Sequence, residues 1–223
     1  MKGAAGLISV SRFLGEGLQR LVTPRPFTIV PNTVDTRYFC FREMTHDRFR
    51  FLHVSNMVPL KNVEGILRAF RQLLKTYPQA ELALVGNRDT VAISYAATLG
   101  LTPPSVTFHG EISNAGVAAQ MQASDALVLF SDMENSPCVI GEALCCGLPV
   151  IATHTGGIPE LVNEANGKLV PVRDEQGLVA AMEQMMLEKN RYNRAGMAVQ
   201  AAAIFSYETI GRAFDRIYAG STP

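Results

Sequence analysis

The stretch SDMENSPCVIGEALCCGLPVIATHTGGIPELV, residues 131–162, decides the fold that the sequence predicts. It follows the apolar run DALVLF, residues 125–130, which predicts a buried strand. Residues 137–147 predict a helix that ends at a glycine, and LPVIAT, residues 148–153, predicts the next strand. Both strands are almost wholly apolar, which is typical of a parallel sheet covered by helices on both faces.

The same alternation of strand and helix continues on both sides of this stretch. We expect further strands at residues 6–11, 27–31, 48–55, 81–86, 105–110 and 167–172. We expect further helices at residues 12–22, 61–78, 90–100, 113–124, 174–190, 191–205 and 206–219, with Asp174 and Ser206 as caps. The predicted fold class is therefore α/β, with a doubly wound parallel sheet. Ligands of such folds bind beyond the carboxyl ends of the strands, so the strand-to-helix turns are the candidate sites.

Composition disfavours several classes of function. The chain has 223 residues, enough for one large or two small domains, and its 20 Lys and Arg balance its 20 Asp and Glu. A nucleic-acid binder normally has a basic excess, so that class is disfavoured. No run of 18 apolar residues predicts a transmembrane helix, and the four cysteines form no CxxC pair, as expected for reduced thiols in the cytoplasm.

The turn SNMVPLKN, residues 55–62, carries Lys61 at the start of a predicted helix. A helix N-terminus already has partial positive charge, so a lysine there is better explained if an anion binds between them. Asn56 can add an amide donor to the same site. The alternative is that Lys61 is an ordinary solvated side chain.

The turn SDMENSP, residues 131–137, can form a second anion site or a cradle for sugar hydroxyls. Asn135 or Ser136 can cap the following helix, and Pro137 fits its first position. The free amides of Ser136, Cys138 and Val139 then point toward the strand ends.

Two glutamates, Glu134 and Glu142, are separated by seven residues, one in this turn and one inside the helix. They need not be adjacent, because Glu142 lies about one and a half helical turns further on. They can face different parts of one ligand. Alternatively, Glu134 only complements the helix dipole and Glu142 is exposed.

Other motifs are absent or weak. The sequence has no GxSxG, HExxH or Walker-type GxxxxGK[ST], and GNRD, residues 86–89, is no GxGxxG turn. The histidines have no metal-ligand spacing, and Asp132 and Glu134 have no third ligand close by in the sequence. We therefore predict no metal site.

Taken in order, these segments resemble the donor-binding half of retaining GT-B glycosyltransferases, the glycosyltransferase group 1 or family 4 type. The resemblance covers almost the whole chain. It is carried by VPNTVDTRYF, SNMVPLKN, VTFHGEIS and E(x7)E, residues 134–142, followed by EALCCGLPVIATHTGGIPE. It implies a Rossmann-like sheet that forms one half of a GT-B fold.

The resemblance also implies roles for single residues. Glu134 matches the first Glu of E(x7)E, next to the transferred sugar and the reaction centre, and Glu142 matches the second, which binds the ribose hydroxyls. Lys61 matches the diphosphate-binding lysine, and the amides of residues 136–139 match the donor cradle. A leaving diphosphate gains negative charge, which Lys61 and helix-end amides can stabilise without a metal, and Glu134 can stabilise the oxocarbenium-like sugar.

Two positions depart from the family pattern. Asn56 stands where the family usually has Arg, so one diphosphate contact is neutral here. GNRD replaces a glycine-rich turn, and Arg88 is a possible compensating cation. The resemblance implies that the base of the nucleotide lies near His109 and Gly110.

The length of the chain is about half that of the family's usual two-domain members. The resemblance implies that residues 1–32 are the last strand–helix unit of an N-terminal acceptor domain plus a hinge. Residues 33–223 would form the domain that binds the nucleotide sugar. The acceptor domain would then belong to a longer chain or to a partner, and an apolar face of the last helix, residues 206–219, could support a dimer.

The function that follows is transfer of a sugar from a UDP- or GDP-sugar to a glycan or lipid-linked acceptor, with retention and without a metal or other cofactor. The isolated chain should have little transferase activity. We expect the full-length enzyme to work in the cytoplasm or at the inner face of the membrane. Two alternatives remain open: a sugar-nucleotide epimerase or phosphorylase on the same fold, or an inactive module that binds nucleotide sugars.

Overall fold

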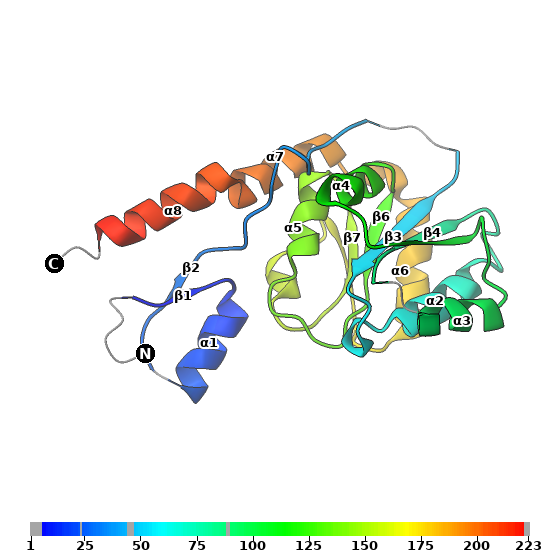
Figure 1. The fold of residues 1–223 in the computed structure, drawn as a ribbon, viewed down its shortest axis with the longest axis horizontal. Helices are drawn as coiled ribbons and strands as arrows, with labels where there is room; N and C mark the ends of the chain where they lie inside the picture. Colours follow the sequence, from blue (N-terminus) through cyan, green and yellow to red (C-terminus); the bar gives the residue numbers. More distant parts are fainter. Residues whose placement is uncertain (1–5, 23, 44–46, 88–89, 221–223) are drawn as a thin grey trace.

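The structure is a computed structural model that describes residues 6–22, 24–43, 47–87 and 90–220 (Figure 1). A six-stranded sheet forms its centre, in the order β5-β4-β3-β6-β7-β8, and every neighbouring pair is parallel. The strands are β3 (Arg50–Ser55), β4 (Glu81–Gly86), β5 (Val106–Gly110), β6 (Ala126–Leu129), β7 (Val150–Thr153) and β8 (Gly167–Val170). The predicted parallel α/β sheet is confirmed.

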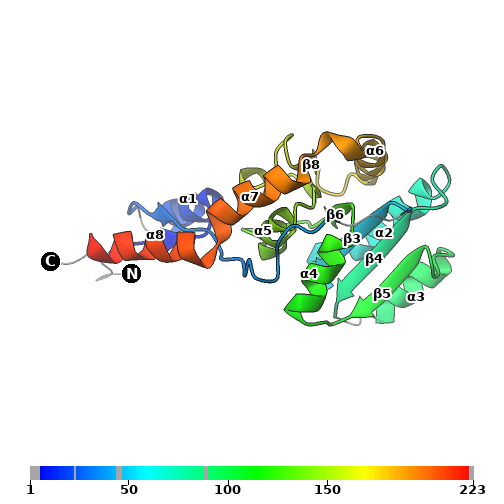
Figure 2. The same cartoon turned by 90° about the horizontal axis from the view of Figure 1, so that it is seen from above.

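Helices cover both faces of this sheet. They are α2 (Val63–Leu73), α3 (Thr90–Thr98), α4 (Asn114–Gln122), α5 (Cys138–Cys145), α6 (Glu175–Leu187) and α7 (Arg194–Phe205). The described residues also form three short 3-10 helices: η1 (Pro59–Lys61) before α2, η2 (Ile158–Glu160) between β7 and β8, and η3 (Lys189–Arg191) between α6 and α7. α2 contacts α3 and α6 on one face, and α5 contacts α4 and α7 on the other (Figures 1 and 2).

The sheet is buried because its strands are apolar on both sides. Phe51 and Leu52 of β3, Leu84 of β4 and the whole of β6 have almost no exposed surface. Burial of this kind stabilises a fold by roughly 25 cal/mol for each Å² of apolar surface removed from water. A polar residue in such a centre needs partners, and His53 on β3 is fully buried there.

The direction in which successive strands are added to the sheet reverses between β3 and β6. β3, β4 and β5 follow one another toward one edge, and β6, β7 and β8 follow one another toward the other. β3 and β6 are neighbours in the sheet although a long segment separates them in sequence. The turns that leave them at their carboxyl ends are therefore brought together at the place where such folds bind ligands.

A separate small unit precedes this sheet. β1 (Ile8–Ser9) and β2 (Thr28–Ile29) pair in parallel with each other, and α1 (Arg12–Leu21) connects them. Both strands are shorter than predicted. The last helix, α8 (Tyr207–Ala219), runs along the same end of the molecule, away from the large sheet, and only its Ile210 is buried (Figure 1). The domain boundary at residue 32, and a dimer through this end, remain predictions.

Two predicted helix caps are confirmed. The Asp174 side chain accepts from the Gly177 amide at the start of α6, and the Ser206 side chain accepts from the Thr209 amide at the start of α8. None of the helices in the described parts of the chain has the length and apolarity that a membrane crossing requires.

Candidate functional site

The turns after β3 and β6 are joined by their backbones. The Asp132 amide, in the loop after β6, donates to the carbonyl of Leu60, at 2.8 Å. This bond holds η1, which carries Lys61, against the loop that carries Glu134. The two segments that the sequence singled out for separate reasons therefore form one site.

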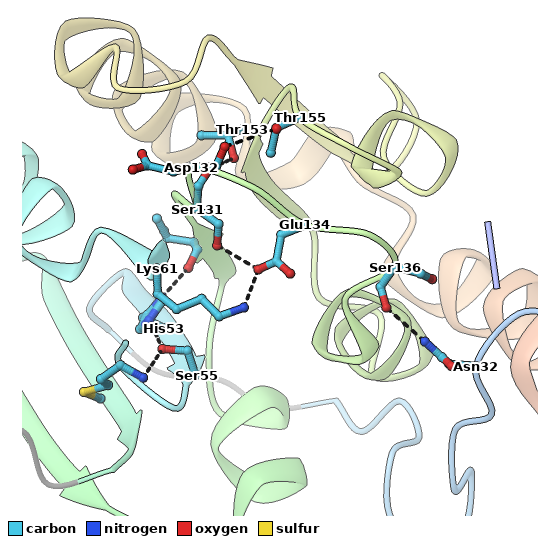
Figure 3. A network of polar contacts seen from close by, with 12 residues as sticks. Asn32, His53, Ser55, Lys61, Ser131, Asp132, Glu134, Ser136, Thr153 and Thr155 are labelled. Carbon is cyan, nitrogen blue, oxygen red and sulfur yellow. Dashed lines mark hydrogen bonds and ion pairs between the residues drawn. The ribbon is translucent and has the colours of Figure 1, made fainter. Parts of the chain in front are cut away.

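Lys61 and Glu134 form an ion pair at the centre of this site (Figure 3). The Nζ of Lys61 lies 2.5 Å from Oε1 of Glu134, and the hydroxyl of Ser131 donates to the same oxygen at 2.8 Å. Only 21% of the Lys61 side chain and 10% of the Glu134 side chain are exposed. The sequence placed these residues at one edge of the sheet but did not predict that they contact each other.

Lys61 lies just before helix α2 and not, as the sequence predicted, at its first residue. It is the last residue of η1, and α2 begins at Val63 with Asn62 as its cap. The Asn62 side chain accepts from the Gly65 amide, so Asn62, and not Lys61, occupies the start of α2. The ammonium group of Lys61 is then directed to Glu134 rather than to the end of its own helix.

His53 supports the turn from inside the sheet. The carbonyl of Val128, on β6, can only accept a hydrogen bond, so Nδ1 of His53 donates to it, at 2.9 Å. Nε2 then accepts from the hydroxyl of Ser55, whose oxygen in turn accepts from the amide of Met57 (Figure 3). Complete burial lowers the pKa of His53 to about 4, so the ring is neutral in this chain of bonds.

The loop of Glu134 is held from its other side by the turn after β7. The hydroxyl of Thr153 donates to the carbonyl of Ser131, and that of Thr155 donates to the carbonyl of Asp132. Gly157 donates its amide to the carbonyl of Glu134 at 3.3 Å. The Gly-Gly turn, formed by Gly156 and Gly157, follows β7. The structure shows it packed on the loop of Glu134.

The predicted cap of α5 is wrong. α5 begins at Cys138, Pro137 is the cap residue itself with ψ 117, and no side chain caps the helix. Ser136 instead presents its carbonyl to the side-chain amide of Asn32, at 2.9 Å. Among the described residues nothing accepts from the amides of Cys138 and Val139, so these two amides are available to a ligand.

Glu142 lies one turn into α5 and is partly buried. Burial raises its pKa above the ordinary value of a glutamate. No hydrogen bond or ion pair joins its carboxylate to another described residue, and desolvation alone accounts for its pKa shift. The interpretation of Glu142 as an exposed helix residue is therefore wrong, and a half-buried acceptor without a partner is suited to bind paired hydroxyl groups.

A cleft of about 870 Å³ opens beside β5, and His109 and Gly110, the two residues expected near the base, are among those that line it. Phe108 and Met57 give it apolar walls, and Met57 connects it to the turn of Lys61. A flat apolar ring fits between such side chains. Asn56 is exposed on the same turn. Arg88, the suggested compensating cation, lies outside the described residues.

No group of three or more His, Cys, Asp or Glu side chains that could hold a metal ion occurs among the residues that the structure describes. Asp132 instead pairs with Arg173, at 2.6 Å. Partial desolvation raises the pKa of the Cys138 thiol, although the residue as a whole is exposed.

Sequence reasoning missed several residues of the site, among them Asn32, His53, Ser55 and Ser131. The position of Ser131 three residues before Glu134, directly after a strand, could have indicated a hydroxyl that holds the carboxylate. A histidine inside an apolar strand could have indicated a buried hydrogen-bond network. No local signal could have indicated the bond of Asn32 to Ser136.

Known proteins are similar to this chain over most of its length. The sequence profile of the family described as glycosyl transferases group 1 matches residues 41–201. A curated relative, the N-acetyl-alpha-D-glucosaminyl L-malate synthase of Bacillus anthracis, is 28% identical over 94% of this chain and 58% of its own length. The chain thus spans little more than half the length of that relative.

Two solved structures share the fold. The sucrose-phosphate synthase of Thermosynechococcus elongatus superposes with a TM-score of 0.82 at 24% identity, over 96% of this chain and 58% of its own. The HepE protein of Anabaena, solved in complex with UDP-glucose, superposes with a TM-score of 0.81 at 22% identity, over 97% of this chain and 64% of its own. These likenesses confirm the predicted fold, one half of the GT-B type.

Proposed function

Because the chain belongs to the group 1 glycosyl transferases, we propose that it is the donor-binding part of an enzyme that transfers a hexose from a UDP- or GDP-sugar. The acceptor is a glycan or a lipid-linked sugar, bound by a part of the enzyme outside this chain. The anomeric configuration is retained. The enzyme works in the cytoplasm or at the inner face of the membrane.

One observation carries this proposal: Lys61 and Glu134 meet where β3 and β6 end, beside the uncapped start of α5 and the cleft at His109. The base fits the cleft, Glu142 accepts from the ribose, and Lys61 with the amides of Cys138 and Val139 binds the diphosphate. The sugar then lies at Glu134. Asn56 contributes at most a neutral donor to the diphosphate.

The chemistry suits these groups. Breaking the bond between sugar and diphosphate leaves negative charge on the diphosphate and positive charge on the sugar carbon. The ammonium group of Lys61 and two backbone amides can stabilise the first charge, and the carboxylate of Glu134 can stabilise the second. Our proposal requires no metal ion or other cofactor.

Calorimetric titration with UDP, GDP and ADP tests the proposal on this chain. We expect UDP or GDP to bind, and Lys61→Ala to weaken the diphosphate by roughly 10- to 100-fold, as for the loss of a charged hydrogen bond. Binding of the nucleoside alone should be unchanged. Lys75→Ala, an exposed lysine beyond α2, is the matched control. Failure of all three nucleotides to bind would refute the proposal.

Turnover measurements separate transfer from its alternatives. This chain should not convert a bound UDP-sugar or GDP-sugar when no acceptor is present. Conversion into an epimer, or release of the sugar to inorganic phosphate, would favour an epimerase or a phosphorylase on the same fold.

A further inference from the structure

We propose that Glu134 competes with the donor's diphosphate for the ammonium group of Lys61, so that an arriving diphosphate releases the Glu134 carboxylate to the sugar. This inference rests on the proposed function. It assigns to the ion pair a role in the order of events at the site: the sugar-facing carboxylate becomes available when the correct leaving group is bound.

Binding of the diphosphate by Lys61 and stabilisation of the sugar by Glu134 depend on the same few atoms. Oε1 of Glu134 accepts from both Lys61 and Ser131, at 2.5 and 2.8 Å. Lys61 has three donors on its nitrogen, and among the described residues the structure gives one of them a partner, Glu134. Both side chains are largely buried, so water screens their attraction only weakly.

A diphosphate is the stronger partner for Lys61. It brings at least two negative charges and several acceptor oxygens, whereas Glu134 brings one charge. A second cation that the structure describes at this loop, Arg173, makes a bidentate contact with Asp132. Of these two described cations, Lys61 is therefore the one that a diphosphate would recruit, and its contact with Glu134 would be lost.

After the exchange, Glu134 still has the hydroxyl of Ser131 as a donor. Its negative charge is no longer neutralised by Lys61, so it can accept from sugar hydroxyls and stabilise positive charge on the sugar carbon. A nucleoside without phosphates cannot cause this exchange. Binding of the diphosphate and availability of the carboxylate are coupled, and the coupling acts in both directions.

Glu134→Gln tests the competition because it keeps the shape of the side chain and removes its charge. We expect UDP or GDP, whichever binds the natural chain, to bind the variant about tenfold more tightly, which corresponds to about 1.4 kcal/mol. The matching nucleoside, uridine or guanosine, should bind equally to both. The gain should disappear when Lys61 is also replaced by Ala. Glu134→Asp, whose shorter side chain reaches Lys61 less well, should show a smaller gain.

Asp132→Asn is the matched control, because Asp132 lies in the same loop but pairs with Arg173. An equal gain in this variant would mean that the total charge of the loop matters, and would overturn the inference. Equal or weaker diphosphate binding by both Glu134→Gln and Glu134→Asp would also overturn it. If the natural chain and all variants bind no nucleotide, it is the proposed function that fails.

Discussion

Gly156 lies directly against the backbone of Glu134: a Cβ built at Gly156 would overlap the carbonyl oxygen of Glu134. The backbone of Gly156 is also in the left-handed region, with φ +56. Gly157 stands in the same relation to the carbonyl of Asn135. The Gly-Gly turn therefore sets the position of the loop that carries Glu134, and no contact with a ligand is needed to explain these glycines.

Gly156→Ala should displace the loop of Glu134. The left-handed backbone and the overlap with a carbonyl oxygen together should lower the free energy of unfolding by roughly 2–4 kcal/mol. Nucleotide binding should weaken at the same time, since the displaced loop leads into the start of α5, whose amides at Cys138 and Val139 are proposed to bind the diphosphate. Urea denaturation and calorimetric titration on the same preparation measure both effects.

Gly211→Ala is the control for this variant. Gly211 lies inside α8 with open space around it, and alanine favours a helix over glycine by roughly 0.5–1 kcal/mol. This variant should be slightly more stable and bind nucleotide as the natural chain does. Equal behaviour of the two variants would contradict the role assigned to Gly156.

The buried ring of His53 predicts a loss of stability in mild acid. Because burial depresses the pKa of His53 to about 4, below its ordinary 6.5, the unfolded chain takes up the proton first as the pH falls. The stabilisation is complete above pH 6.5 and is lost between 6.5 and about 4. A depression of this size is worth roughly 3 kcal/mol.

Urea denaturation from pH 7 to pH 4 measures this loss. His53→Asn cannot titrate, so its free energy of unfolding should fall less steeply over this range, even if the variant is less stable throughout. His154→Asn replaces an exposed histidine and should leave the slope as it is. Parallel slopes for His53→Asn and the natural chain would show that His53 is not the titrating group.

Glu160 connects the two parts of the fold at the start of α1. Its two carboxylate oxygens accept from the amides of Arg12 and Phe13, each at 2.8 Å. Glu160→Ala should therefore loosen α1, at a cost of about 0.5–2 kcal/mol, the usual worth of a helix cap. Hydrogen exchange should become faster at the α1 amides and stay unchanged in β3 and β6. Glu16→Ala, on the exposed side of α1, should change neither.

The sequence predicted the sheet well and the contacts of the site poorly, for one physical reason. Apolar strands such as DALVLF and periodic helices are local patterns, and local patterns indicate element type and order. The pair of Lys61 and Glu134 joins residues 73 positions apart, and it depends on side-chain rotamers that no local pattern encodes. The bond of the Asn32 side chain to the carbonyl of Ser136, beside the start of α5, likewise joins residues 104 positions apart.

The Glu142 carboxylate should lower the stability of the fold and strengthen nucleoside binding. Burial raises the pKa of its carboxyl group, which means that the folded chain disfavours the ionised form present at neutral pH. Glu142→Gln removes that charge and should increase the free energy of unfolding at pH 7, with a smaller gain as the pH approaches the raised pKa.

Nucleoside binding should change in the opposite direction. A carboxylate accepts hydrogen bonds from two ribose hydroxyls, and an amide accepts them less strongly, so uridine or guanosine should bind roughly tenfold more weakly to Glu142→Gln. Inorganic pyrophosphate, which has no ribose, should bind as it does to the natural chain. Because two readouts must move in opposite directions on one preparation, a misfolded variant cannot imitate the result. Unchanged nucleoside binding in a more stable protein would place the ribose elsewhere.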